Sequence, residues 1–151
     1  MLYLSLGSNL GDRRANLSAA VRLIGERIGK VTEKSGIIET EPWGFVSDNP
    51  FLNQVIAVET DMEPIDILTE TQAIERELGR RKKTDSGNYS DRCIDIDLLL
   101  YNDRMIRDGR LQLPHPLMHL RRFVLEPLAE IAPDAIHPGL KKSVRELLDT
   151  L

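Results

Sequence analysis

Residues 92–101, RCIDIDLLLY, alternate aliphatic with other residue types over the usual length of a β-strand. Successive side chains of a strand point to opposite faces of the sheet, so Asp95 and Asp97 share one face while Ile94, Ile96 and Leu98 share the other. The two aspartate Cα atoms are then roughly 6–7 Å apart. Carboxylates at this spacing repel each other unless a cation lies between them, and two divalent ions about 3.5–4 Å apart fit the gap. The pair is either a metal site or two solvent-facing acids.

Length and composition predict one soluble, cytoplasmic domain over residues 1–151. A chain of 151 residues can bury a core without disulfides. The formal net charge of −4 argues against a dedicated nucleic-acid binder. The single cysteine, Cys93, excludes an internal disulfide and is interpreted as a small core residue of the strand. No signal peptide and no apolar run of membrane-spanning length is recognisable, so we expect no membrane association.

Hydrophobic periodicity and end signals predict the remaining elements. Asp12 is a candidate N-cap of a helix that Gly29 ends, and Ser143 to Glu146 reads as a capping box. A hairpin is expected at Asp108-Gly109. Strands are expected at 2–6, 31–40, 53–60 and 92–101, and helices at 12–29, 64–79, 121–131 and from 143 onward.

The segment 41–51 combines aromatic residues with proline and glycine. It contains the only tryptophan, Trp43, and two of the three phenylalanines, Phe45 and Phe51. Aromatic residues in such a loop either pack beneath it as a small cluster or form walls that stack on a flat ligand. The spacing alone leaves both interpretations open.

The segment 80–92 is polar, long for a connection, and contains five cationic residues just before the paired aspartates. It is either a solvated charged loop or a clamp for a polyphosphate whose other side faces metal ions. On the helix before it, Gln72 and Glu75 lie about one turn apart, and Glu75 could equally be a surface acid. Further on, two prolines fix the backbone around His115, which is either a phosphate donor or a turn residue.

Four segments, in order, resemble the 6-hydroxymethyl-7,8-dihydropterin pyrophosphokinase family. They are LGSNLGD at 6–12, TEPWG at 40–44 with FLN at 51–53, RCIDIDLL at 92–99, and LPHP at 113–116 with Arg121 and Phe123. The resemblance implies transfer of pyrophosphate from ATP to the hydroxymethyl group of the reduced pterin, in folate biosynthesis, leaving AMP. It also implies two Mg²⁺ ions and a ferredoxin-like α+β fold, a three-layer sandwich whose mostly antiparallel sheet has helices on both sides. We expect a monomer whose partners are small molecules.

The same resemblance implies roles for individual residues. Asp95 and Asp97 would bind the metal and, with Arg80 and Arg92, form the catalytic set. The expected ATP-binding residues are Gln72, Glu75, Arg80, Lys82, Arg92, Arg110, His115 and Arg121. The expected pterin-binding residues are Thr40, Trp43, Phe51, Asn53 and Phe123, with the two phenylalanines stacking on the two faces of the pterin.

The chain departs from the family pattern just before the aspartates. Tyr89-Ser90-Asp91 precede Arg92 where the family commonly has Trp-Gly-Pro, and Lys82 replaces the usual arginine, which removes a bidentate phosphate contact. Two other functions stay open from the residues themselves. One is a non-catalytic small-molecule-binding module on the same scaffold, and the other is a metal-dependent nucleotidyltransferase that releases pyrophosphate.

Overall fold

The computed structural model describes residues 1–41, 49–79 and 93–151. Its main sheet has five strands, in the order β2-β4-β1-β5, with β3 paired to β4 beyond the end of β2, and every pairing is antiparallel. The elements of this part of the chain are β1 (Leu2–Ser8), α1 (Arg13–Arg27), β2 (Lys30–Lys34), β3 (Ile38–Thr40), β4 (Phe51–Glu59), α2 (Pro64–Gly79), β5 (Asp95–Tyr101), β6 (Ile106–Arg107), β7 (Gln112–Leu113), the 3₁₀ helix η1 (Met118–Leu120), α3 (Arg122–Ile131), β8 (Ile136–His137), β9 (Lys142–Ser143) and α4 (Val144–Asp149).

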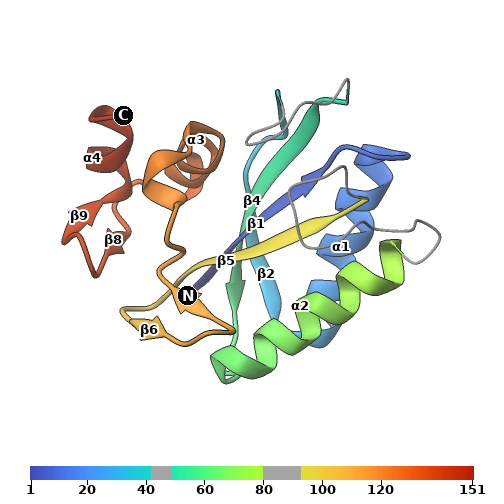
Figure 1. The fold of residues 1–151 in the computed structure, drawn as a ribbon, viewed down its shortest axis with the longest axis horizontal. Coiled ribbons are helices and arrows are strands. Elements are labelled where there is room, and N and C mark those ends of the chain that lie inside the picture. Colours follow the sequence, from blue (N-terminus) through green and yellow to red (C-terminus); the bar gives the residue numbers. More distant parts are fainter. Residues whose placement is uncertain (42–48, 80–92) are drawn as a thin grey trace.

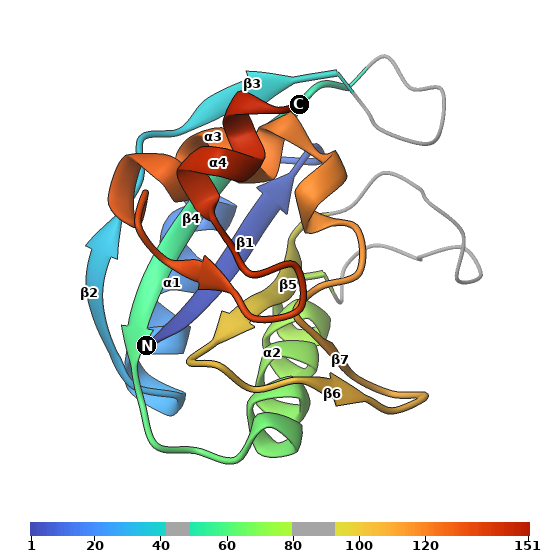
Figure 2. The ribbon, with the colours of Figure 1, turned by 90° about the vertical axis from the view of Figure 1, so that its left-hand side faces the viewer.

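The elements form three layers (Figure 1). Helices α1 and α2 cover one face of the main sheet, and α3 and α4 lie on the opposite side with the small β8–β9 hairpin. The view in Figure 2 looks onto that second layer, with α3 and α4 in front of the sheet. The expected three-layer sandwich with an antiparallel central sheet is therefore confirmed. Within the described ranges, no helix is long and apolar enough to cross a membrane.

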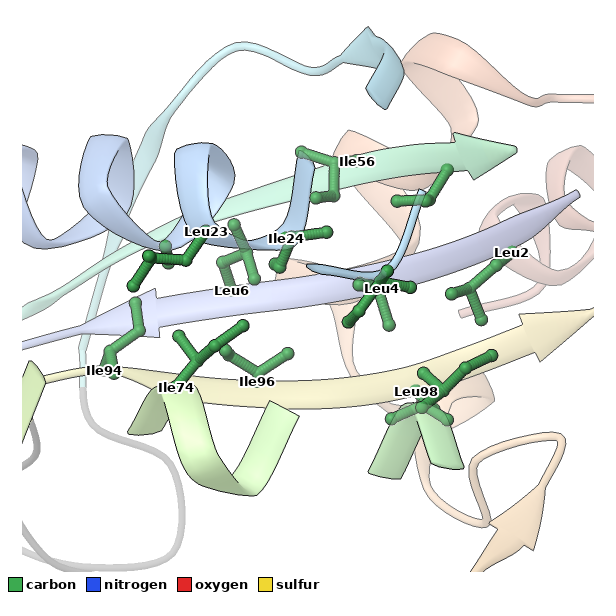
Figure 3. Close-up of a cluster of buried hydrophobic side chains, with 14 of the residues drawn as sticks. Leu2, Leu4, Leu6, Leu23, Ile24, Ile56, Ile74, Ile94, Ile96 and Leu98 are labelled. Atoms are coloured by element: carbon green, nitrogen blue, oxygen red, sulfur yellow. The ribbon is translucent and has the colours of Figure 1, made fainter. Parts of the chain in front are cut away.

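A large apolar core fills the space between the sheet and the helices α1 and α2 (Figure 3). Leu4 and Leu6 of β1 and Ile96 of β5 point into it, as the alternation of those strands predicts. Ile24 of α1 and Ile74 of α2, both fully buried, close it from the helical side. Burial of these side chains fixes which face of the sheet points away from α1 and α2.

A second apolar cluster holds α3 and α4 to the other face of the sheet. It joins Val55 of β4 and Leu99 of β5 to Leu125 of α3 and Val144 of α4, all at most 1% exposed. Near this cluster, on the same face, the strands carry polar residues or glycine instead of aliphatic ones. This polar part of the sheet is the region that concerns function.

We expected one strand at 31–40, but the structure has two, β2 and β3. Between these two strands, hydrogen bonds that involve side chains hold the chain against β4. Buried Ser35 accepts a hydrogen bond on its hydroxyl from the backbone of Val55, and its carbonyl accepts one from the Gln54 amide. The Ser143–Glu146 capping box and the Asp12 N-cap, which accepts from Ala15 N at 3.1 Å, are confirmed.

Three further features differ from what the sequence led us to expect. The helix expected at 121–131 begins at Arg122 and follows η1, and the β8–β9 hairpin was not anticipated. Cys93 lies just before β5 and is partly exposed, so its interpretation as a core residue within the strand was wrong.

Gly29, which follows α1, gives the first prediction. A Cβ at this position would overlap the carbonyl oxygen of Glu59 and come within 2.8 Å of the Thr60 Cβ. The first obstacle is backbone of a central strand, so Gly29→Ala should lower the free energy of unfolding by about 1–3 kcal/mol, measured by urea denaturation. Gly79→Ala is the matched control at the end of α2, since nothing lies within 4 Å of its Cβ position. Equal stability of the two variants would contradict this packing.

Candidate active site

The paired aspartates lie where the strand pattern predicts. Asp95 and Asp97 are half-buried on the face of β5 that points away from α1 and α2. Ile94, Ile96 and Leu98, at most 5% exposed, point into the core on the other side. The two carboxylates therefore share one face of the sheet, at its β5 edge.

Strand register extends this polar face across three strands. Gly7 of β1 pairs with Asp95 on one side and with Asn53 of β4 on the other. Residues paired across a sheet point to the same face, so Asp95, Gly7 and Asn53 form one row, here named the Asp95–Gly7–Asn53 row. Two strand spacings separate its ends by about 10 Å. Because its middle residue is glycine, no side chain rises between the carboxylate and the amide.

The two β4 side chains nearest Gly7 lean over it. A Cβ on Gly7 would lie 3.3 Å from Asn53 Oδ1 and 3.4 Å from Phe51 Cδ1. The Asn53 amide nitrogen donates to the Thr40 hydroxyl at 2.6 Å, which fixes the orientation of the buried amide. Thr40, Phe51 and Asn53, all expected to bind the pterin, are thus brought together around Gly7.

Residues of the first loop and of α1 hold the start of β4 in place. The Arg13 guanidinium donates to the carbonyl of Pro50 and to the carboxylate of Glu39 on β3, both at 2.9 Å. The Asn9 amide donates to the carbonyl of Asn49 at 3.1 Å. These bonds connect the N-terminal segment to both strands that carry the Thr40–Phe51–Asn53 group.

His115 faces the aspartates from the segment between β7 and η1. Its backbone N–H donates to Leu99 O of β5 at 3.0 Å, and its Nδ1 accepts from the backbone N–H of Leu117 at 3.1 Å. Its Nε2 lies 4.0 Å from Asp97 Oδ2. Since Nδ1 is an acceptor, the proton of a neutral imidazole is on Nε2, the atom that faces Asp97.

The surroundings of His115 favour its neutral form. The pKa of His115 is lowered to about 4, first by burial and then by the positive charge of Arg121, while Asp95 acts in the opposite direction. At neutral pH the ring therefore presents an N–H group without adding charge. The contact with Asp97 is then one between a neutral ring and a carboxylate, not an ion pair.

Arg121 brings a buried cation to the same region. It is 7% exposed and immediately precedes α3. Its guanidinium carbon lies 5.6 Å from the centroid of the Phe123 ring, within cation–π range. The structure therefore combines an anion-binding group and a partly exposed aromatic ring near His115.

The remaining described residues that were predicted to bind ATP differ in how close they lie to the polar face of the sheet. Glu75 of α2 contacts β5, where its Oε2 accepts a hydrogen bond from the backbone N–H of Ile96 at 2.7 Å. Gln72, one turn earlier, is exposed. Arg110 lies on the β6–β7 hairpin with an exposed side chain, and its backbone N–H donates to Asp108. Its predicted nucleotide contact stays a prediction.

Other predicted positions lie outside the described residues. These are Trp43 of the aromatic segment, Arg80, Lys82 and Arg92 of the cationic segment, and the altered positions 89–91. Their expected roles stay predictions from the sequence.

The donor set suits a metal shared with a phosphate ligand. Within 1–41, 49–79 and 93–151, no group of three or more histidine, cysteine or acidic residues could enclose an ion. Mg²⁺ commonly takes one or two protein carboxylates and completes its shell with water and phosphate oxygens. Asp95 and Asp97 match that requirement, and a closed structural metal site does not.

The structure adds residues that sequence reasoning missed as site residues. Ser5, Gly7 and Arg13 all belong to the region around the polar face. The alternation in LYLSLGS contains a signal for the first two, because small or polar residues recur on one face of an otherwise leucine-rich strand. Arg13 gave no such signal, since its partners are distant in sequence.

Comparison with known proteins finds extensive similarity. A sequence model of the family described as 7,8-dihydro-6-hydroxymethylpterin-pyrophosphokinase (HPPK) matches residues 3–133. A Porphyromonas gingivalis protein named 2-amino-4-hydroxy-6-hydroxymethyldihydropteridine pyrophosphokinase is 52% identical over 139 residues, 91% of this chain and 94% of that protein. An Aquifex aeolicus protein of the same name is 38% identical over 145 residues, 96% of this chain and 88% of that protein.

Solved structures show the same fold at low identity. A Plasmodium falciparum structure titled HPPK-DHPS wild type with pteroate superposes with a TM-score of 0.80 at 16% identity. The match covers 99% of this chain but 44% of that one, so this chain spans less than half of the solved protein. The expected ferredoxin-like fold is confirmed.

The environment of His115 gives a prediction for the metal-free protein. In an NMR titration of the imidazole nitrogens, His115 should protonate near pH 4 and carry its single proton on Nε2 at pH 7. Because its pKa is lower in the folded than in the unfolded chain, this residue decreases stability as the pH falls from about 6.5 toward 4. Protonation near pH 6.5, or the proton on Nδ1, would contradict the geometry.

Proposed function

The chain belongs to the 7,8-dihydro-6-hydroxymethylpterin-pyrophosphokinase family, and we propose that its two substrates meet across the Asp95–Gly7–Asn53 row. The protein is a diphosphotransferase of folate biosynthesis with ATP as co-substrate. One observation carries the assignment of the site. Paired carboxylates and an oriented amide share one face of the sheet, separated by a residue without a side chain.

The nucleotide side of the site is the β5 end of the row. Asp95 and Asp97 would hold Mg²⁺, and we assign two ions to the pair. When bound, the metal neutralises phosphate charge and makes the β-phosphorus more electrophilic. Arg121 and the Nε2–H of His115 supply a cation and a neutral donor for phosphate oxygens. Because His115 is neutral, it does not compete as a cation with the metal for the carboxylates.

The pterin side of the site is the β4 end of the row. Asn53, oriented by Thr40, binds the polar edge of the pterin, and Phe51 and Phe123 stack on its faces. Each stacked pair contributes about 0.5–1.5 kcal/mol beyond its buried area. With the ring held there, its hydroxymethyl group points along the row toward Asp95.

The reaction is then largely one of positioning. The hydroxymethyl oxygen attacks the β-phosphorus, forming a new O–P bond. The bond from that phosphorus to the α–β bridging oxygen breaks, and AMP leaves with the oxygen. The hydroxyl proton passes to water or to an aspartate oxygen. Further contacts with ATP are assigned to Gln72 and Arg110, and to three cations outside the described ranges, Arg80, Lys82 and Arg92. Glu75 belongs to the nucleotide side of the site.

The assembly and location follow the expectations from the sequence. We propose a monomeric, cytoplasmic protein whose residues 1–151 form one pyrophosphokinase domain. Several structural neighbours carry HPPK-DHPS in their titles, and the match covers 42% and 44% of two of those chains. The binding-module and nucleotidyltransferase alternatives are not favoured by membership in this family.

A product assay tests the function. With ATP, Mg²⁺ and 6-hydroxymethyl-7,8-dihydropterin, the purified protein should form AMP and the pterin diphosphate in equal amounts. Without Mg²⁺ or without the pterin, no AMP should appear. Release of ADP would indicate an ordinary kinase, and release of pyrophosphate would indicate a nucleotidyltransferase. Either result would overturn the proposal.

The assignment of Asp95 and Asp97 is tested in the same assay. Asp95→Asn and Asp97→Asn should each reduce the rate at least 100-fold, because an amide oxygen is a weaker ligand for Mg²⁺ than a carboxylate. Thermal stability should not fall, because the change removes repulsion between like charges. A rate within tenfold of the wild type for either variant would refute its role as a metal ligand.

A further inference from the structure

The strand that carries the paired aspartates lies at an edge of the main sheet. In the part of the chain that the structure describes, β5 pairs with β1 alone and ends the main sheet. Backbone N–H groups of a strand alternate in direction, so every second N–H of an edge strand points out of the sheet. Such a strand frays more readily than one paired on both sides.

One outward N–H of β5 is bound by a carboxylate. Glu75 Oε2 accepts from the backbone N–H of Ile96 at 2.7 Å, a charge-assisted bond shorter than the usual amide bond of about 2.9 Å. Ile96 is the residue between Asp95 and Asp97. Glu75 therefore holds the backbone at the midpoint of the aspartate pair, although it comes from the opposite layer.

The rest of α2 is rigidly placed for this contact. Ile74, the residue beside Glu75, is fully buried and lies against Ile94 and Ile96 in the core (Figure 3). Thr71, one turn earlier, is also buried. Because the buried residues hold α2 in place, the position of the Glu75 carboxylate is also fixed. Its hydrogen bond with Ile96 therefore fixes the position of β5 relative to α2.

We propose that Glu75 is a positioning residue, which sets the spacing and direction of Asp95 and Asp97 through the N–H of Ile96. The inference rests on the proposed function, because it takes the two aspartates as metal ligands. It differs from the expected contact of Glu75 with ATP, since the carboxylate here acts on the protein backbone. Groups that orient metal ligands commonly contribute 10–100-fold to metal affinity.

Three variants of α2 distinguish the possibilities. Glu75→Ala removes the acceptor, whereas Glu75→Gln keeps an acceptor oxygen and removes the charge. Glu77→Gln is the control, because Glu77 lies on the same helix and pairs with Arg27 of α1. Two measurements are needed for each variant. The first is the hydrogen-exchange rate of the Ile96 amide in the ligand-free protein, and the second is the affinity for Mn²⁺ in the presence of α,β-methylene-ATP.

Glu75→Ala should exchange the Ile96 amide at least tenfold faster and bind Mn²⁺ at least tenfold more weakly. Glu75→Gln should recover most of both losses, and Glu77→Gln should match the wild type. Neither measurement requires turnover, so a failure here is distinguishable from a failure of the product assay.

Three outcomes would overturn the proposal. Weaker binding with unchanged Ile96 exchange would make Glu75 a direct ligand-binding residue. Faster exchange with unchanged Mn²⁺ affinity would make the bond purely structural. A glutamine variant as impaired as the alanine variant would show that the charge itself matters, not the hydrogen bond.

Discussion

The antiparallel register of β4, β1 and β5 is the constraint on which the site depends. It places Asp95, Gly7 and Asn53 in one row although they are far apart in the sequence. Side chains of a strand alternate with a period of two, so a slip of one residue would turn the acids into the core. Burial of Leu4 and Ile96 beneath α1 and α2 prevents that slip. The burial of the apolar side chains thus determines which face of the sheet carries the polar residues.

Charge is distributed on this face so that anionic ligands and cations can both be accommodated. The two aspartates supply negative charge at the edge of the sheet, and buried Arg121 supplies positive charge from the α3 layer. His115 stands between these groups as a neutral donor, because burial and the Arg121 charge lower its pKa. A metal–polyphosphate complex matches this arrangement, since it needs carboxylates on one side and cationic or neutral donors on the other.

Local patterns in the sequence predicted much of this structure. The alternation around Asp95 and Asp97 fixed their shared face, and the caps at Asp12 and Ser143 are encoded within a few residues. Features that depend on distant partners were not predictable from such patterns. Ser35 interrupts a strand through bonds to β4, and Arg13 binds groups 26 and 37 residues away. The resemblance to a family supplied the expected site residues, and the strand register explains why Asp95 and Asn53 share one face of the sheet.

Paramagnetic broadening in solution tests whether the metal-bound nucleotide lies at the β5 end of the Asp95–Gly7–Asn53 row. Mn²⁺ is added with α,β-methylene-ATP to the ¹⁵N-labelled protein, and the loss of each amide signal is followed. We expect the amides of Asp95 and Asp97 to broaden first, followed by those of their strand partners Gly7 and Ser5. The amides of α1 around Ala20 should persist, and Asp95→Asn should abolish the pattern. Broadening centred on α1, or unchanged in that variant, would contradict this position of the nucleotide.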